Sequence, residues 1–323
     1  MELITIYKPV QKELAEVGNQ FRLVIESEHT DFPDLYKMLS YILSGGKAIR
    51  PALTLLAGKF YNCDTAKLLS MATASELLHM ATLVHDDAID KSDVRRWRQT
   101  VNKVWDEDKA ILLGDYLFAK AGEFAAATEN LRVVKLFSQT LEAISRGELK
   151  QSFDAFNLEQ TREDYIQRIA KKTAALFSMA TETGAILSQA PEKSIRILKE
   201  YGYNLGITFQ IVDDVLDFTS SEEKLGKPIG SDLAQGTLTL PSMLLMEHHP
   251  EDNPVKKLFQ NRDKQENIKQ AIELVRNSSI VQECYAVASD YRTKACRNLD
   301  LLPDNPSRQA LIDLADYIIN RKR

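Results

Sequence analysis

Residues 83–96 read Leu-Val-His-Asp-Asp-Ala-Ile-Asp-Lys-Ser-Asp-Val-Arg-Arg and follow a long apolar segment. Apolar residues at helical spacing lead into this stretch and predict a helix. On a helix, side chains four positions apart share a face, so Asp86 and Asp90 lie one turn apart with Asp87 beside them. Like charges at this spacing repel one another. Hard oxygen donors on one face suit magnesium, which binds carboxylates together with the phosphates of a substrate.

The same spacing recurs at residues 211–218, Ile-Val-Asp-Asp-Val-Leu-Asp-Phe, where Asp213, Asp214 and Asp217 follow another apolar run. A single cluster of this kind is more often a solvated helix end. Two clusters, each inside apolar sequence and each followed by basic residues, favour a multi-metal site that faces an anion such as a diphosphate. The basic residues are Arg95 and Arg96 after the first cluster and Lys224 and Lys227 after the second.

The composition indicates a chain with a large core and no nucleic-acid partner. Of the 323 residues, 44% are hydrophobic, and the 13 glycines and 10 prolines form no linker that would divide the sequence. We therefore expect a single helical domain over residues 1–323. The net charge of −5, with both signs interspersed, gives no electrostatic footprint for nucleic acid. The sequence has no signal-peptide pattern and no run of about 18 apolar residues, so we expect a cytoplasmic protein without a membrane span.

Hydrophobic periodicity predicts helices throughout the chain and no strands. The expected helices cover residues 2–27, 33–44, 52–60, 65–90, 111–127, 131–150, 162–188 and 195–218. The segment 65–90 is apolar on several faces, which is typical of a buried helix. Residues 241–323 alternate helices with short turns and contain no pattern that indicates chemistry, so we interpret them as scaffold. The expected fold is all-α, with roughly ten or more helices around a central cavity.

Weaker signals accompany the two clusters. Gly45 and Gly46 precede Lys47 and Arg50 just before a helix, which places flexible backbone and positive charge where an anion binds, although an ordinary turn with solvated bases has the same pattern. His79 lies two helical turns before Asp86 on the same face. It is either a core histidine or a ligand of a second anion.

Further polar residues interrupt the later apolar helices. Lys172 and Thr173 follow Lys171 inside an apolar segment, where basic pairs are usually solvated, and Gln210 lies one turn before Asp213. Residues 219–238 contain Gly226-Lys227-Pro228. This segment is either a loop that closes over a reactive intermediate or a plain connection.

Taken in order along the chain, these motifs resemble those of the trans-prenyl diphosphate synthases. The shared motifs are Gly-Gly-Lys47-x-x-Arg50-Pro, His79, the first aspartate cluster with Arg95-Arg96, Lys172-Thr173, Phe209-Gln210, the second cluster, and Gly226-Lys227-Pro228 with Gly-Ser-Asp-Leu. The resemblance covers essentially the whole chain. Within the family, the sequence is most similar to the large catalytic subunit of bacterial heptaprenyl or hexaprenyl diphosphate synthases.

The resemblance implies a role for each motif. Three magnesium ions would bridge the diphosphate of an allylic prenyl substrate, held by Asp86, Asp90 and Asp213 with support from Asp87, Asp214 and Asp217. The residues expected to contact that diphosphate are Arg95, Lys172, Thr173, Gln210 and Lys227. The residues expected to hold the diphosphate of isopentenyl diphosphate are Lys47, Arg50, His79 and Arg96. Catalysis would depend most directly on Asp86, Asp90, Lys172 and Asp213.

Two positions depart from the family pattern. Trp97 stands where the family usually has glycine, and Thr237 where many members have lysine. The small residues Ala81 and Thr82, one turn before Asp86, stand where members that make short products tend to have aromatic residues. We therefore expect a long product of about C30 to C40, for a quinone side chain, because small residues leave the cavity open.

Alternatives remain at this stage. A terpene cyclase shares the ionisation chemistry but usually replaces the second aspartate cluster. A non-catalytic subunit tends to lose its aspartates, and both clusters are intact here. A shorter-chain synthase, such as a geranylgeranyl or farnesyl diphosphate synthase, and a catalytic chain that needs a small partner subunit both stay open. By analogy with the family, we expect a homodimer.

Overall fold

Helix α5 (Thr65–Ile89) is buried along most of its length and carries the first aspartate cluster at its C-terminal end. The Asp64 side chain begins the helix by accepting hydrogen bonds from the backbone amides of residues 66 and 67. The computed structural model describes residues 2–95, 97–221, 228–261 and 265–321. Over these residues, α5 packs against α4 (Ile49–Gly58), α7 (Glu107–Ala126) and α10 (Ala175–Leu187).

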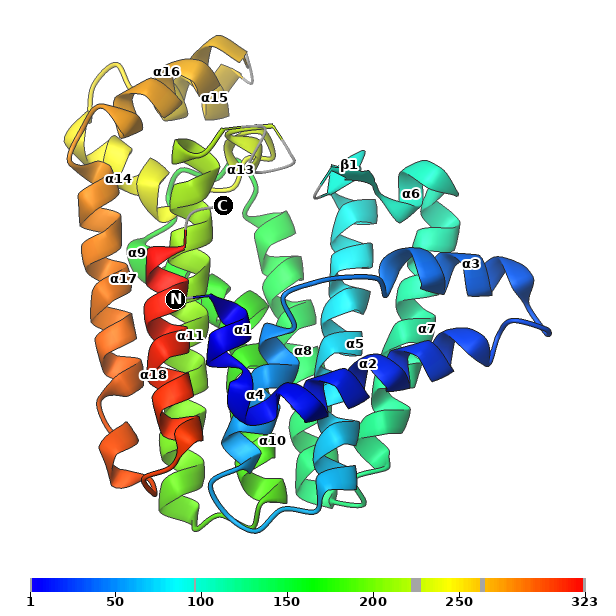
Figure 1. Ribbon diagram of the computed structural model, residues 1–323. Helices are drawn as coiled ribbons and strands as arrows, with labels where there is room; N and C mark the ends of the chain where they lie inside the picture. The colour runs from blue at the N-terminus through cyan, green and yellow to red at the C-terminus, as the bar shows by residue number, and fades with distance from the viewer. Residues whose placement is uncertain (1, 96, 222–227, 262–264, 322–323) are drawn as a thin grey trace.

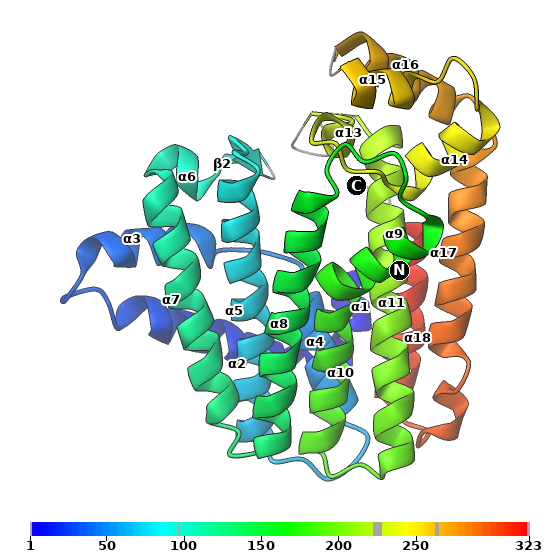
Figure 2. The same cartoon turned by 180° about the vertical axis from the view of Figure 1, so that it is seen from behind.

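Long helices stand side by side with α5 and form the body of the molecule (Figures 1 and 2). Helix α10 packs on α11 (Glu192–Thr219), and α11 packs on α17 (Ile280–Cys296). The body also contains α8 (Leu131–Phe153) and α18 (Pro306–Asn320). Shorter helices gather at one end: α13 (Ser231–Ala234), α14 (Leu240–His248), α15 (Pro254–Asn261) and α16 (Gln265–Arg276).

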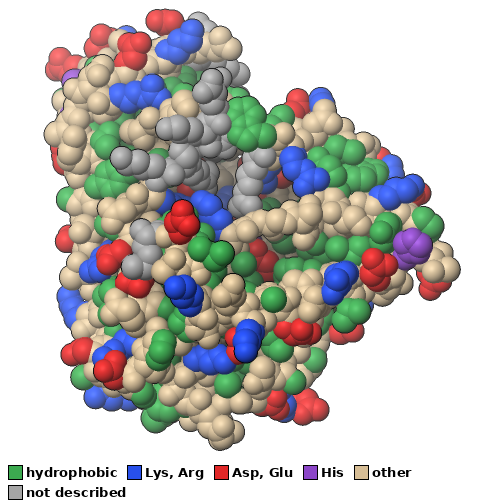
Figure 3. Space-filling model, in the orientation of Figure 1, with side chains coloured by type: hydrophobic (Ala, Val, Ile, Leu, Met, Phe, Trp, Pro, Cys, Tyr) green, Lys and Arg blue, Asp and Glu red, His purple; other side chains and the backbone are tan. Residues whose placement is uncertain are grey.

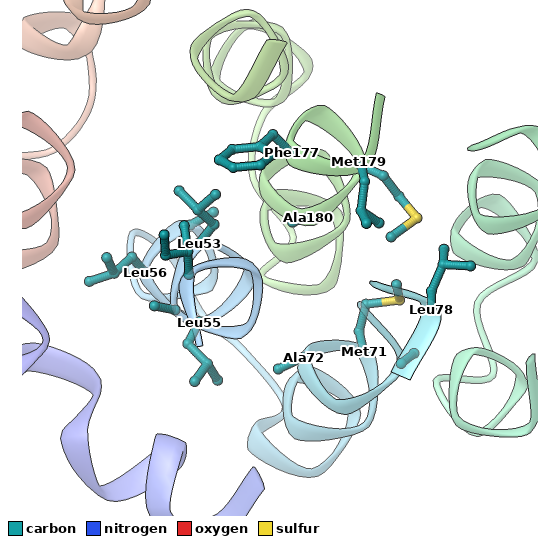
Figure 4. Packing of buried hydrophobic residues seen from close by; sticks show 14 of the residues in the cluster. Leu53, Leu55, Leu56, Met71, Ala72, Leu78, Phe177, Met179 and Ala180 are labelled. Carbon is teal, nitrogen blue, oxygen red and sulfur yellow. The ribbon is translucent and has the colours of Figure 1, made fainter. Parts of the chain in front are cut away.

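The main apolar core lies between α4, α5 and α10. Figure 4 shows side chains from these three helices meeting there. They are Leu53, Leu55 and Leu56 of α4, Met71, Ala72 and Leu78 of α5, and Phe177, Met179 and Ala180 of α10. All have at most 2% of their surface exposed, so this contact is fully desolvated and fixes the three helices relative to one another.

The helix expected over residues 2–27 is divided in the structure. Helix α1 (Leu3–Ile6) and a 3₁₀ turn (Lys8–Val10) precede α2 (Gln11–Glu26). Pro9 lies in the 3₁₀ turn, and proline lacks the amide that a continuous helix requires. The next helix, α3, covers Pro33–Ile42. The periodicity was right about helical structure here but wrong about its continuity.

The expected absence of strands is wrong at one place. Strands β1 (Val94–Arg95) and β2 (Arg98–Gln99) pair antiparallel directly after α5 and lead into α6 (Val101–Val104). Two-residue strands are too short to produce an alternating pattern in the sequence. The fold is nevertheless all-α, as expected.

The helix expected over residues 162–188 contains a π turn. Helix α9 (Arg162–Ile169) continues into a π segment (Ala170–Ala174) and then into α10. Lys172 and Thr173 lie within this segment. Single π turns inside α-helices often occur at functional sites, because they re-aim the side chains that they carry.

The other expected helices are found close to their expected bounds, and a final 3₁₀ turn (Leu299–Leu301) joins α17 to α18. Within the described ranges, no helix combines the length and apolar character that crossing a membrane requires.

The close contact between α10 and α4 gives a stability prediction. A Cβ atom at Gly184 would meet the backbone carbonyl oxygen of Thr54 on α4. We expect Gly184→Ala to lower the free energy of unfolding by about 1–3 kcal/mol, because the two helices must move apart. Urea denaturation measures this value.

Gly18 provides the matched control. It lies in α2 with nothing within 4 Å of an added Cβ. Gly18→Ala should raise the unfolding free energy by about 0.5–1 kcal/mol through helix propensity. A Gly184→Ala protein as stable as wild type would contradict the packing described here.

Candidate active site

Helices α5 and α11 have their C-terminal ends at the same end of the helical body (Figure 1). Two adjoining cavities lie near these ends. The surface is indented there, and Lys and Arg side chains lie around the indentation (Figure 3). The first cavity has a volume of about 570 Å³ and the second of about 430 Å³. Both are lined by Asp86, Arg95, Lys172, Thr173, Gln210 and Asp213.

The first cavity contains carboxylates from both predicted clusters. Asp86, Asp87 and Asp90 from α5 and Asp213 and Asp214 from α11 line it. Asp90 is the C-cap of α5, so the first cluster occupies the end of the helix where the backbone dipole is already negative. The arrangement is unfavourable unless positive charge lies nearby.

Arg95 supplies part of that charge. Its Nε donates to both carboxylate oxygens of Asp87, at 2.8 and 2.9 Å. Burial raises the pKa of Asp87, and the neighbouring Arg95 opposes this shift. Strand β1 thus holds Arg95 against the end of α5, and Arg95 fixes the orientation of Asp87.

Lys172 lies between two acidic side chains. Its Nζ is 2.7 Å from Oε1 of Glu148 and 3.9 Å from Oδ2 of Asp86. Burial alone would lower the pKa of Lys172, but Asp86 and Glu148 outweigh burial and raise it. The pKa of Glu148 is raised by burial, with Lys172 opposing the shift. The lysine is therefore charged at neutral pH and directed into the space that the two cavities share.

Glu148 was not predicted as a site residue. It lies on α8, where a charged residue in an amphipathic pattern indicates a solvated face. The preceding residue, Gly147, brings α8 close to the π turn: a Cβ there would lie 3.1 Å from the backbone nitrogen of Lys172. This close approach places Glu148 beside Lys172, and no local sequence pattern indicates it.

The second cluster is held by hydrogen bonds. The Tyr165 hydroxyl donates to Oδ2 of Asp214 at 2.7 Å, and Nε2 of Gln210 donates to Oδ1 at 2.8 Å. Thr173 in turn donates to Oε1 of Gln210 at 2.6 Å. Burial, with a contribution from Asp232, raises the pKa of Asp214 to about 7. The side chains of Thr173 and Gln210 thus form a chain from the π turn to Asp214.

Asp217 is placed differently from the other five aspartates. It is 1% exposed and is not among the residues that line the two cavities. Its carboxylate accepts hydrogen bonds from the Ser231 hydroxyl at 3.0 Å and from the backbone amide of Asp232 at 3.3 Å. In this position it secures α13 to the end of α11.

The second cavity contains the predicted cationic residues. Lys47, Arg50 and His79 line it together with Glu76. The Gly-Gly loop leads directly into α4, and the Tyr7 hydroxyl donates to the carbonyl oxygen of Lys47 at 3.0 Å. The Gly-Gly-Lys sequence, which predicts either an anion site or an ordinary turn, therefore lies beside a cavity, as an anion site requires. Arg96, Lys224 and Lys227 lie outside the described residues.

Arg321 also lies in the second cavity, so the interpretation of residues 241–323 as scaffold without chemistry is wrong at this position. Its Nη2 is 2.8 Å from Oδ1 of Asp213 and donates to the carbonyl oxygen of Phe209 at 2.7 Å. The guanidinium lies 3.8 Å from the centre of the Phe209 ring. A basic residue after the last helix has no distinctive spacing, so no sequence pattern indicates its role.

A third, more apolar cavity of about 540 Å³ begins at Asp86 and Asp90 and extends between α5 and α8. Thr82 lines it, as expected for a residue below the first cluster. Ala81 has no exposed surface, so its side chain does not reach the cavity, contrary to expectation. The large apolar residues along its walls are Ile89, Phe118, Leu141, Ile144 and Leu149.

Comparison with known proteins shows which family the chain belongs to. The family model described as polyprenyl synthetase matches residues 32–275. The chain belongs to this family. It is 38% identical over 305 residues to heptaprenyl diphosphate synthase component 2 from Bacillus subtilis (strain 168), covering 93% of this chain and 87% of the relative.

Solved structures of family members have the same fold. Heptaprenyl diphosphate synthase from Staphylococcus aureus matches with a TM-score of 0.91 at 40% identity, covering 97% of this chain and 98% of the other. A polyprenyl synthase from Caulobacter crescentus CB15, complexed with calcium and isoprenyl diphosphate, matches with a TM-score of 0.92 at 31% identity, covering 100% and 98%.

The ion pair of Lys172 and Glu148 gives a prediction about pH. Lys172→Gln leaves Glu148 buried near Asp86 without its cation, so the pKa of Glu148 in the folded protein should rise further. The folded state then binds more protons than the unfolded state. Its stability should fall as the pH rises from about 5 to 8, by about 1–3 kcal/mol more than in wild type.

Chemical denaturation in metal-free buffer at several pH values measures the effect. The double variant Lys172→Gln with Glu148→Gln is the control, and it should recover most of the loss at pH 8. Equal pH dependence in wild type and Lys172→Gln would show that the two side chains do not interact in the folded protein.

Proposed function

We propose that the chain is a magnesium-dependent trans-prenyltransferase that adds isopentenyl diphosphate units to an allylic prenyl diphosphate and releases a long-chain polyprenyl diphosphate. The observation that carries the proposal is the pair of adjoining cavities, the first richer in carboxylates and the second richer in basic side chains, which share Asp86, Lys172 and Asp213. Two diphosphates bound there would bring their prenyl groups together where the cavities meet.

The first cavity suits the allylic diphosphate and its magnesium ions. Asp86, Asp90 and Asp213 would hold the metal, because carboxylate oxygens are hard donors of the kind that magnesium prefers. Among residues whose placement is described, no group of three His, Cys, Asp or Glu side chains is arranged to hold a metal ion by itself. Oxygens of the substrate diphosphate would therefore complete the coordination. Calcium and isoprenyl diphosphate in the Caulobacter relative support this assignment.

The other three aspartates of the two clusters are held by hydrogen bonds from neighbouring side chains. Asp87, Asp214 and Asp217 accept hydrogen bonds from Arg95, from Tyr165 with Gln210, and from Ser231, respectively. We propose that these contacts keep both helix ends rigid, and that Asp87 and Asp214 contribute to the metal site. Lys172, Thr173, Gln210 and Arg95 would contact the same diphosphate, as would Lys227 from outside the described residues.

The second cavity suits isopentenyl diphosphate. Lys47, Arg50 and His79 provide positive charge and hydrogen-bond donors for its diphosphate, together with Arg96 from outside the described residues. Arg321 adds a further guanidinium that sequence analysis did not predict. Because this cavity is richer in basic side chains than the first, its anion needs less help from metal.

The chemistry follows from this placement of charge. The allylic carbon–oxygen bond breaks, and its electron pair leaves with the diphosphate. The cation of Lys172 stabilises the new negative charge, and magnesium held by Asp86, Asp90 and Asp213 would supply Lewis-acid stabilisation of the same group. The double bond of isopentenyl diphosphate attacks the resulting carbocation and forms the new carbon–carbon bond. A proton then leaves to an oxygen of the departing diphosphate and restores a double bond. Apolar walls between α5, α8 and α10 exclude the water that would trap the cation.

The third cavity suits a growing apolar chain. It begins at Asp86 and Asp90, where the allylic head group would bind, and continues along Thr82 and Ile144. We propose a product of about C30 to C40, since Thr82, the residue on the cavity wall one turn before Asp86, is small. The heptaprenyl names of the relatives from Bacillus subtilis and Staphylococcus aureus support this range, and a quinone side chain is the proposed use.

A second candidate function has the same chemistry but requires a partner subunit. The Bacillus subtilis relative is named as component 2 of its synthase, which favours a catalytic chain that works with a separate small subunit. The alternative is a self-sufficient homodimer. A terpene cyclase is disfavoured, because both aspartate clusters are intact in the sequence and carboxylates from both line one cavity.

Product analysis of the purified chain tests the proposal. The chain is incubated with magnesium, farnesyl diphosphate and labelled isopentenyl diphosphate, and the products are separated by length. We expect a ladder that ends at a defined long product and disappears when EDTA removes the magnesium.

The other outcomes are equally informative. Magnesium-dependent binding of both substrates without product would indicate a chain that awaits a small subunit. A protein that is folded but binds neither diphosphate would contradict the proposed function.

Thr82 gives a prediction about product length. Thr82→Phe would close the third cavity one turn from Asp86, so we expect the main product to lose at least two isoprene units, with total turnover reduced less than tenfold. Thr82→Val has nearly the same volume and should keep the wild-type length. An unchanged product distribution in Thr82→Phe would show that the growing chain takes another path.

A further inference from the structure

Trp97 adopts an unusual backbone conformation at the edge of the second cavity. Its φ angle is 66°, in the left-handed region that bulky side chains rarely occupy and that glycine adopts freely. The indole is 63% exposed, so burial in the core does not compensate for the strain. Strain of this kind is often found at functional positions.

The hairpin that carries Trp97 is attached to the end of α3 and to the loop that follows it. Nη1 of Arg98 donates to the Ser44 hydroxyl at 2.9 Å, and its guanidinium lies 4.2 Å from the centre of the Tyr41 ring. The Tyr41 hydroxyl donates to the carbonyl oxygen of Gln99 at 2.7 Å. Ser44 directly precedes the Gly-Gly loop, so these contacts fix the position of the hairpin relative to Lys47.

Trp97 lines the second cavity together with Lys47, His79 and Met80. An indole has a large apolar face and a single N–H group that only donates hydrogen bonds. It therefore matches an anion whose remaining surface is apolar, and it offers nothing to a metal ion. The other cavity contains no tryptophan among its lining residues, so this feature distinguishes the two sites.

We propose that Trp97 is a specificity-determining contact of the second cavity, which donates its Nε1–H to the diphosphate of the homoallylic substrate and covers that diphosphate with its ring. The inference rests on the proposed function, because it takes isopentenyl diphosphate as the ligand of this cavity. In this position Trp97 separates the bound diphosphate from solvent, while Arg98 and Tyr41 hold the backbone in its strained conformation.

The chain contains only two tryptophans, which makes a direct test possible. Trp105 packs edge-to-face on Tyr41, with ring centres 5.4 Å apart, and is not among the residues that line the second cavity. The variant Trp105→Phe leaves Trp97 as the only indole. Titration of this variant with isopentenyl diphosphate in the presence of EDTA should change the emission of Trp97 with a saturable dependence on concentration. Trp97→Phe, which retains Trp105, is the matched control and should show little change.

Kinetics separate a substrate contact from a structural role. Trp97→Phe loses the N–H donor, and we expect its KM for isopentenyl diphosphate to rise about tenfold, the effect of one lost hydrogen bond to a charged group. Trp97→Gly should raise this KM further, although glycine relieves the backbone strain and should not lower stability. In both variants, kcat and the KM for farnesyl diphosphate should stay within about threefold of wild type.

The possible results distinguish failure of this inference from failure of the proposed function. If calorimetry detects binding of isopentenyl diphosphate to wild type but the emission of Trp97 does not respond, the role of Trp97 is overturned and the function stands. If both Trp97 variants had the wild-type KM for isopentenyl diphosphate, the proposed role of Trp97 would also be overturned. If wild type does not bind isopentenyl diphosphate at all, the proposed function fails and this inference fails with it.

Discussion

The arrangement of charged side chains in the site is determined by the mutual repulsion of carboxylates at the ends of two helices. Three aspartates lie in the last turn of α5, where the helix dipole adds to their negative charge, and α11 brings two more to the same cavity. Arg95 and Arg321 offset part of this charge through close ion pairs with Asp87 and Asp213, and Lys172 does so at a distance of 3.9 Å from Asp86. The remaining negative charge is what a metal–diphosphate complex would neutralise.

The surrounding helices keep these charges in position. The labelled side chains of α4, α5 and α10 in Figure 4 are buried and pack the three helices against one another. The π turn then directs Lys172 and Thr173 into the site, and Gly147 allows α8 to approach closely enough for Glu148 to pair with Lys172. Apolar packing thus determines where the polar groups meet, which is why a small displacement of α8 would separate them.

Local patterns were sufficient to predict a large part of this arrangement. Both aspartate clusters, the basic loop at Lys47 and the extent of α5 depend on spacing along one segment, and spacing is visible in the sequence. Glu148 and Arg321 were missed because α8 and the C-terminal residues reach the site only through long-range packing. The π turn and the break at Pro9 were missed because periodicity reports that residues are helical, not how the helix is wound. Ala81 was wrongly expected to line the product cavity. Its distance from Asp86 along the chain can be read from the sequence, but its burial cannot.

The proposed function requires that the two aspartate clusters form one metal-dependent diphosphate site. The most direct test is a double-mutant cycle with Asp86→Asn, Asp213→Asn and both together, which measures magnesium-dependent binding of farnesyl S-thiolodiphosphate by calorimetry. We predict that each single variant loses at least tenfold in affinity and that the double variant loses much less than the sum, with a coupling of about 1–3 kcal/mol. Additive losses, or binding that does not depend on magnesium, would contradict a shared site.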